Sequence, residues 1–178
     1  MSRNLTMRPS RRQKAARLNS NVRCMMDKIA EKTCFIYVLR LNFERWYIGC
    51  TTNFDQRMKS HFGKGGAVAT KECPPIFIHK VFMLDDYRIR TTPARQVAEV
   101  LVANSYAIRY GYEKVRGAKH GKGWQDLPSK NNLRDIKRFQ KWKTIDYGQE
   151  LMSNLVEVDP KTLLSDKTLN KIENLTRK

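Results

Sequence analysis

Acidic residues are scarce in this sequence. Its 178 residues include only 17 Asp and Glu against 35 Lys and Arg, which leaves a formal net charge of +18. A surplus of positive charge this large in a small protein is typical of proteins that bind phosphate polymers. We therefore expect nucleic acid as the partner. A generic basic protein and a protein of acidic membrane surfaces are the alternatives that the composition leaves open.

The sequence also lacks long apolar runs and paired cysteine motifs. No segment approaches the roughly 18 apolar residues of a membrane helix, and residues 1–26 lack the apolar run of a secretory signal. No CxxC pair occurs, which argues against a zinc ribbon, and nothing indicates an oxidising compartment. We interpret the cysteines as reduced, mostly buried thiols, and expect a soluble intracellular protein of the nucleoid, nucleus, an organelle or a virus. The four cysteines are Cys24, Cys34, Cys50 and Cys73.

The length and the hydrophobic content of 40% suit one domain with a modest core and appendages. We assign residues 34–112 to the folded domain, residues 1–33 to a basic, flexible arm and residues 113–178 to a basic helical C-terminal extension. The arm is expected because residues 1–26 hold seven basic residues and no acidic one, with little to bury. An organelle transit peptide and a nuclear signal have the same composition and stay open.

A hairpin and a helix are predicted at the start of the domain. Residues 34–41 and 46–51 are rich in β-branched and aromatic residues and are joined by a short polar stretch, which predicts a β-hairpin. Asn53, followed by Gln56 three residues later, predicts the N-cap of a helix. Residues 76–84 predict a third strand. The expected fold class is α/β (α+β), with a three-stranded antiparallel sheet flanked by helices.

A long and mostly apolar helix is predicted between Thr92 and Gly111. Glu99 is conspicuous in this helix, because a buried carboxylate costs several kcal/mol unless a partner or a metal compensates it. A position on the solvent-exposed edge of the helix, or an ion pair with an arginine, would also explain a glutamate here.

Residues 130–143 predict an amphipathic basic helix in the C-terminal extension. Its polar face would contact the nucleic acid, while binding to a membrane surface is the alternative for the same pattern. That face consists of Arg134, Lys137, Arg138 and Lys141.

Several polar side chains are expected to converge on one face of the hairpin. Alternate strand residues share a face, so a hairpin can bring Tyr37 and Tyr47 together as neighbours. Gly49 would leave room beside them for another group to approach. Arg57 and His61, four residues apart, lie on one face of the following helix. Two phenols, a guanidinium and an imidazole would therefore meet at one place.

The order and spacing of these residues resemble the GIY-YIG nuclease superfamily, over residues 34–112. Glu99 lies where that family places a metal-binding glutamate. Phe35 stands in the position of the usual first glycine. Some members use an asparagine after the glutamate; Lys114 aligns with that position, so that either Asn104 or no residue would take the role. The matching residues are Tyr37, Tyr47-Ile48-Gly49, Thr51, Asn53, Arg57 and His61, followed by the Gly-rich segment 63–71 with its Thr-Lys pair.

The resemblance implies metal-dependent hydrolysis of phosphodiester bonds in nucleic acid, with DNA as the expected substrate. Glu99 would hold one Mg²⁺ or Mn²⁺ ion, and Arg57 would clamp the non-bridging phosphate oxygens. Tyr37 is expected to be the general base, with its pKa lowered by nearby cations, and Tyr47 would orient the water or share that role. His61 would support Tyr37 or protonate the leaving group. Further expected contacts to the substrate are Gly49, Asn53 and Lys71.

A protein of the same fold without catalysis remains the main alternative. It would bind DNA or RNA, as part of a nucleoprotein or viral assembly, because fold alone does not settle function.

Overall fold

The computed structural model describes residues 33–84, 92–118, 120, 122–125 and 146–176, which all fall within one compact unit beginning at Thr33. The predicted arm, apart from Thr33, lies outside the described residues. So does the predicted helix 130–143, with the four basic residues of its polar face. Among the described residues, no helix is long and apolar enough to cross a membrane.

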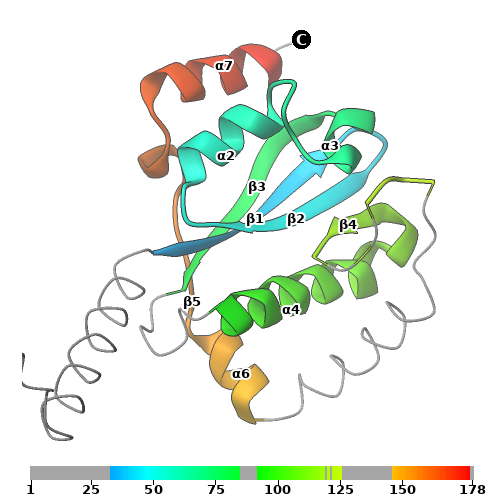
Figure 1. Cartoon of the computed structure of the whole chain (residues 1–178), viewed down its shortest axis with the longest axis vertical. Helices are drawn as coiled ribbons and strands as arrows, with labels where there is room; N and C mark the ends of the chain where they lie inside the picture. The colour runs from blue at the N-terminus through cyan, green and yellow to red at the C-terminus, as the bar shows by residue number, and fades with distance from the viewer. Residues whose placement is uncertain (1–32, 85–91, 119, 121, 126–145, 177–178) are drawn as a thin grey trace, which may run out of the picture. The chain divides into compact units, whose positions relative to one another are not determined.

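The structure is a mixed α/β fold built on a five-stranded sheet in the order β4-β2-β1-β3-β5 (Figure 1). Antiparallel pairs join β1 to β2, β1 to β3 and β3 to β5, whereas β2 and β4 are parallel. The strands are β1 Cys34–Leu41, β2 Arg45–Thr51, β3 Pro75–Leu84, β4 Val115–Gly117 and β5 Leu155–Glu157.

The predicted hairpin and third strand are confirmed, but the predicted three-stranded antiparallel sheet is wrong in size and in kind. The sheet gains one strand at each edge, and one of these is parallel to its neighbour. Both added strands have only three residues, which is too short for an alternating pattern to be recognised in the sequence. They come from the chain after residue 112, while the predicted domain boundary at that residue stays a prediction.

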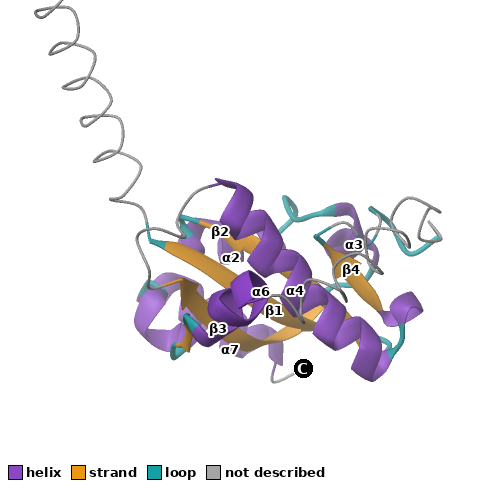
Figure 2. Cartoon of the chain, turned by 90° about the horizontal axis from the view of Figure 1, so that it is seen from below, coloured by secondary structure: helices purple, strands orange, loops and turns teal. Residues whose placement is uncertain are grey.

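Helices cover both faces of this sheet. Figure 2 shows α4 lying across one face together with α6, and Figure 1 shows α2, α3 and α7 on the opposite side. The α-helices are α2 Phe54–His61, α3 Val68–Glu72, α4 Thr92–Tyr110, α6 Asp146–Ser153 and α7 Asp166–Thr176, with 3₁₀ turns η2 Tyr112–Lys114 and η3 Pro160–Leu163.

Strand alternation divides the core into two clusters. Ile36, Val38 and Ile48 pack with apolar residues of α4 on one face of the sheet. Tyr37 and Tyr47 lie on the other face, with Phe54, Met58 and other apolar residues of α2 and α7. The sequence-based expectation that the two tyrosines share a face is therefore confirmed.

Local signals in the sequence fix the beginning of α2. The Asn53 side chain accepts a hydrogen bond from the backbone N–H of Gln56 at 3.2 Å, as an N-cap does. The predicted long helix forms as α4, and Gly111 follows it with a φ of 99°. This conformation favours glycine and ends the helix.

Gly117 is the last residue of β4 and cannot accept a side chain without strain. Its φ is 94°, and a Cβ atom there would collide with the carbonyl oxygen of Ile48. We expect Gly117→Ala to destabilise the fold by about 1–3 kcal/mol from backbone strain alone, with the collision adding to that cost. Thermal unfolding measures this effect. Gly65→Ala is the matched control, because its Cβ would meet only the Ser60 side chain; equal melting temperatures for the two variants would contradict the argument.

Candidate active site

The structure brings together the four polar residues that were expected to converge. Tyr37 comes from β1, Tyr47 from β2, and Arg57 and His61 from one face of α2. The Tyr37 hydroxyl lies 2.8 Å from Nε2 of His61, and Nε of Arg57 donates to it at 2.9 Å. A longer bond of 3.5 Å joins Nη2 of Arg57 to the Tyr47 hydroxyl. Arg57 therefore bridges the two phenols.

The series of hydrogen bonds continues from His61 to Thr70, which is its last side chain. Nδ1 of His61 lies 2.9 Å from the Thr70 hydroxyl, which itself donates to the carbonyl oxygen of Ala67 at 2.9 Å. One arrangement gives each of these hydrogens an acceptor: the Tyr37 hydroxyl donates to Nε2, and Nδ1–H donates to Thr70. His61 is then neutral and carries its proton on Nδ1.

Burial sets the charge states of the side chains in this series. Tyr37 has no exposed surface and His61 is 2% exposed. Burial raises the pKa of Tyr37, against the opposing effect of Arg57, and burial together with the charge of Arg57 lowers the pKa of His61 to about 3. The expected lowering of the pKa of the Tyr37 phenol does not come from Arg57, because desolvation outweighs the arginine.

Thr70 determines which nitrogen of His61 carries the proton, so it should stabilise the whole series of hydrogen bonds. We expect Thr70→Val to lower the free energy of unfolding by about 1–3 kcal/mol, because Nδ1–H loses its buried acceptor. Thr70→Ser keeps the hydroxyl and is the matched control. Nitrogen NMR of the imidazole reports the tautomer, together with thermal unfolding. An unchanged tautomer and melting temperature in Thr70→Val would show that Thr70 does not hold the ring.

Glu99 lies on α4 and lines a hollow of about 240 Å³. Its carboxylate accepts hydrogen bonds from the backbone N–H groups of Ala118 and Cys50. Burial raises its pKa to about 6, although these bonds and the charge of Arg57 act in the opposite direction. The hollow is lined by Tyr47, Ala67, Val68, Glu99, Gly117, Ala118 and Lys122.

The sheet topology explains why Glu99 reaches this place. β4 runs beside β2 only from Trp46 to Ile48, so the backbone of Gly49 and Cys50 has no partner strand on that side among the described residues. The N–H groups of Cys50 and Ala118 therefore remain available to the carboxylate from α4. Tyr47 and Glu99 lie in the same hollow, although the two residues belong to different layers.

The donor set at this hollow suits one hard divalent cation. Among the described residues, no group of three or more His, Cys, Asp or Glu side chains is placed to hold a metal ion. Mg²⁺ in enzymes commonly uses one or two carboxylates, with water and substrate phosphate as the other ligands. A single carboxylate that faces a hollow of this size fits that pattern.

The two tyrosines differ in their access to the hollow. Tyr47 lines it and retains 8% of its exposure, whereas Tyr37 on the central strand β1 is fully buried. Burial also raises the pKa of Tyr47, with Arg57 opposing this. Tyr47 is therefore the tyrosine with access to the hollow, and the expected role of Tyr37 as the proton acceptor does not match this geometry.

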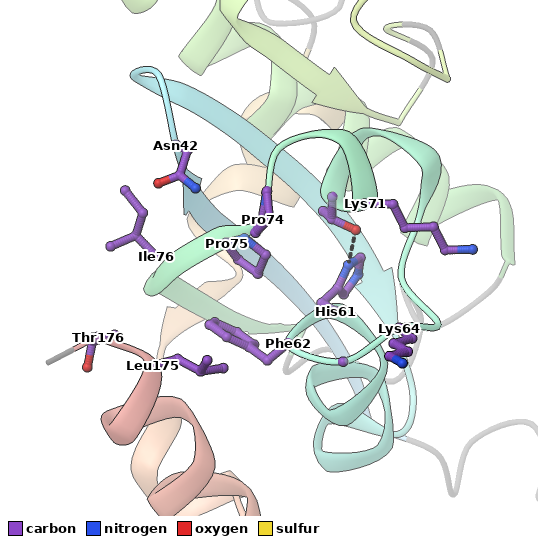
Figure 3. Close-up of a pocket in the computed structure, with 12 residues that line it drawn as sticks. Asn42, His61, Phe62, Lys64, Lys71, Pro74, Pro75, Ile76, Leu175 and Thr176 are labelled. Atoms are coloured by element: carbon purple, nitrogen blue, oxygen red, sulfur yellow. Dashed lines mark hydrogen bonds between the residues drawn. The ribbon is translucent and has the colours of Figure 1, made fainter. Parts of the chain in front are cut away.

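The other predicted substrate contacts fall in three different places. The space beside Gly49 is filled by the ring and hydroxyl of Tyr37, so the expectation that another group approaches there is wrong. Asn53 caps α2 and is exposed. Lys71 lines a second hollow of about 600 Å³, on the Thr70 side of His61 (Figure 3).

Neither candidate for the additional asparagine of the resemblance lies in the Glu99 hollow. Lys114 forms an ion pair with Glu44 at 3.1 Å, and Asn104 is buried, with its Oδ1 3.0 Å from Nε2 of His120.

Lys122 is an exposed cation that lines this hollow, and the sequence did not indicate this position for it. The neighbouring Trp124 anchors its segment, because the indole N–H donates to the carbonyl oxygen of Ala69 and the backbone N–H to the Glu72 carboxylate, both at 2.8 Å. The guanidinium of Arg45 lies 4.4 Å from the centre of the Trp124 ring. A lysine between two glycines in a loop carries no periodic signal, so only the fold reveals its position.

Searches against protein-family models, curated proteins and solved structures return no match to this chain.

Proposed function

We propose that this protein is a metal-dependent endonuclease of the GIY-YIG type that hydrolyses phosphodiester bonds of nucleic acid, with DNA as its substrate. The observation that supports this most is the placement of Tyr47, bonded to the bridging Arg57, in one hollow with the half-buried carboxylate of Glu99. The family resemblance rests on the motif residues in the sequence. The net charge of +18 supports a nucleic acid as the partner.

Hydrolysis of a phosphodiester needs positive charge on the phosphate, a placed water and a proton acceptor. Arg57 can bind non-bridging oxygens through its planar guanidinium, since Nε is fixed by Tyr37 and Nη2 reaches toward Tyr47. Lys122 adds a second cation at the hollow.

We assign the proton acceptor to Tyr47 and a positioning role to Tyr37. Tyr47 faces the hollow, so its oxygen can take a proton from a water molecule there. Tyr37 fixes Arg57 through Nε and is itself held by His61. A divalent cation at Glu99, when bound, would supply charge that favours the phenolate and the developing negative charge on phosphate.

Nicking of supercoiled plasmid tests the proposal directly. We expect the full chain to convert supercoiled to open-circular DNA with Mg²⁺ or Mn²⁺ and to lose this activity with a chelator. A panel of duplex, nicked, flapped and four-way DNA, together with RNA, then identifies the substrate. Tight DNA binding without cleavage of any of these substrates would reject the enzyme and favour a nucleic-acid-binding protein.

A further inference from the structure

Two thiols lie in contact on the face of the sheet that α4 covers. Sγ of Cys34 on β1 is 2.8 Å from Sγ of Cys50 on β2. The register pairs Cys50 with Ile36, so Cys34 is its diagonal neighbour on the same face of the sheet. Cys34 is fully buried and Cys50 is partly exposed, and both are free thiols. A reagent from solvent would therefore reach Cys50 first.

Cys50 is also connected to the proposed metal ligand. Its backbone N–H is one of the two that donate a hydrogen bond to the Glu99 carboxylate. Gly49 precedes it, and the Tyr37 ring packs against that glycine. A movement of Cys50 would therefore disturb Glu99 directly. Cys73, by contrast, lies in the other core cluster, where its sulfur accepts from Arg45 at 2.8 Å.

We propose that Cys34 and Cys50 are a redox-active dithiol whose oxidation to a disulfide switches off the chemistry at Glu99; the second half of this statement rests on the proposed function. The sulfurs need to approach by less than about 1 Å, because a disulfide bond is about 2.05 Å long. Forming the bond draws Cys50 toward β1 and away from the carboxylate that its N–H supports.

The oxidant is a low-molecular-weight disulfide of the glutathione type. The Cys50 thiolate attacks one sulfur, forms a mixed disulfide and releases one small thiol. The Cys34 thiolate then attacks Sγ of Cys50 and releases the second small thiol. The two protein thiols lose two electrons and two protons in total, and the small disulfide takes up both as two thiols. Reduction by excess thiol reverses the sequence.

The test uses the full chain with Cys24→Ser and Cys73→Ser, so that Cys34 and Cys50 are its remaining thiols. The protein is equilibrated with oxidised and reduced glutathione at several ratios, and alkylation followed by peptide mass spectrometry then maps the sulfurs. We expect a Cys34–Cys50 disulfide in oxidising mixtures, reversed by dithiothreitol. Free thiols or only a glutathione adduct on Cys50 under excess oxidised glutathione would overturn the dithiol.

Plasmid nicking of the same samples tests the switch. We expect activity to fall about tenfold or more on oxidation, the loss typical when the support of a metal ligand is removed, and to return on reduction. Cys34→Ser in the same background is the control: it cannot form the disulfide, so it should keep its activity in every mixture in which the mass spectra show Cys50 without a glutathione adduct. A disulfide that forms without any loss of nicking would overturn the switch. If the reduced protein never cleaves, the proposed function and the switch both fail. Peptide mass spectrometry still decides whether Cys34 and Cys50 form a disulfide.

Discussion

Glu99→Gln is expected to abolish metal-dependent cleavage while the fold and the affinity for DNA without metal are kept. Glutamine has the same shape, but it lacks the charge that holds a divalent cation. A loss of several kcal/mol of transition-state stabilisation corresponds to a rate about 10³-fold lower. Single-turnover nicking with Mg²⁺ measures this loss, and Glu150→Gln, which changes an exposed carboxylate on α6, is the matched control. Wild-type activity in Glu99→Gln would reject the metal assignment.

The pKa of Glu99 adds a pH dependence to the same prediction. Because the folded protein raises this pKa from 4.5 to about 6, protons compete with the metal below about pH 6. We expect cleavage at limiting Mg²⁺ to fall as the pH falls through 6. Higher Mg²⁺ should move this fall to lower pH. A profile that does not respond to the Mg²⁺ concentration would show that the titrating group is not the metal ligand.

As the pH rises through this range, the stability of the folded protein should fall while its activity rises. A carboxyl group whose folded pKa lies above its unfolded value destabilises the folded state when it is ionised, and the cost develops as pH rises from about 4.5 to 6. Glu99→Gln removes this cost. We therefore expect the melting temperature of Glu99→Gln at pH 7 without metal to equal or exceed that of the natural chain, which separates loss of chemistry from loss of fold.

The sequence was sufficient for features that depend on local periodicity. The alternation in residues 34–41 placed Tyr37 with Leu39 on one face and Ile36 with Val38 on the other, as the two core clusters show. The four-residue spacing of Arg57 and His61 placed both on the face of α2 that meets the tyrosines. These features follow from strand and helix geometry alone.

Features that depend on topology were not predictable in the same way. Whether a phenol reaches solvent depends on its place in the sheet: β1 is the central strand, while β2 is followed only by the short β4. Tyr37 and Tyr47 therefore look alike in the sequence and differ in burial. Thr70 and Lys122 belong to segments whose positions are fixed by tertiary contacts, through His61 and Trp124 respectively.

The two tyrosines should differ in what their loss does to the protein. Tyr47→Phe removes a hydroxyl with one long hydrogen bond of 3.5 Å, so the melting temperature should change little. Its turnover should fall by about 10²-fold or more, since a proton acceptor contributes about 10²–10⁴-fold. Tyr37→Phe leaves Nε2 of His61 as a buried acceptor without its partner and frees Nε of Arg57. We expect it to cost about 1–3 kcal/mol of stability, with a smaller loss of turnover than in Tyr47→Phe.

Thermal unfolding and single-turnover cleavage of both variants, measured side by side, decide between the two assignments. Each variant is the control for the other, because the substitution is the same and the residues share one face of the sheet. If Tyr37→Phe is inactive with an unchanged melting temperature while Tyr47→Phe cleaves normally, the roles are the reverse of those proposed here. The buried phenol would then take the proton from water, and the hollow at Glu99 would have to open toward β1 when the substrate binds, because Tyr37 has no exposed surface in the free protein.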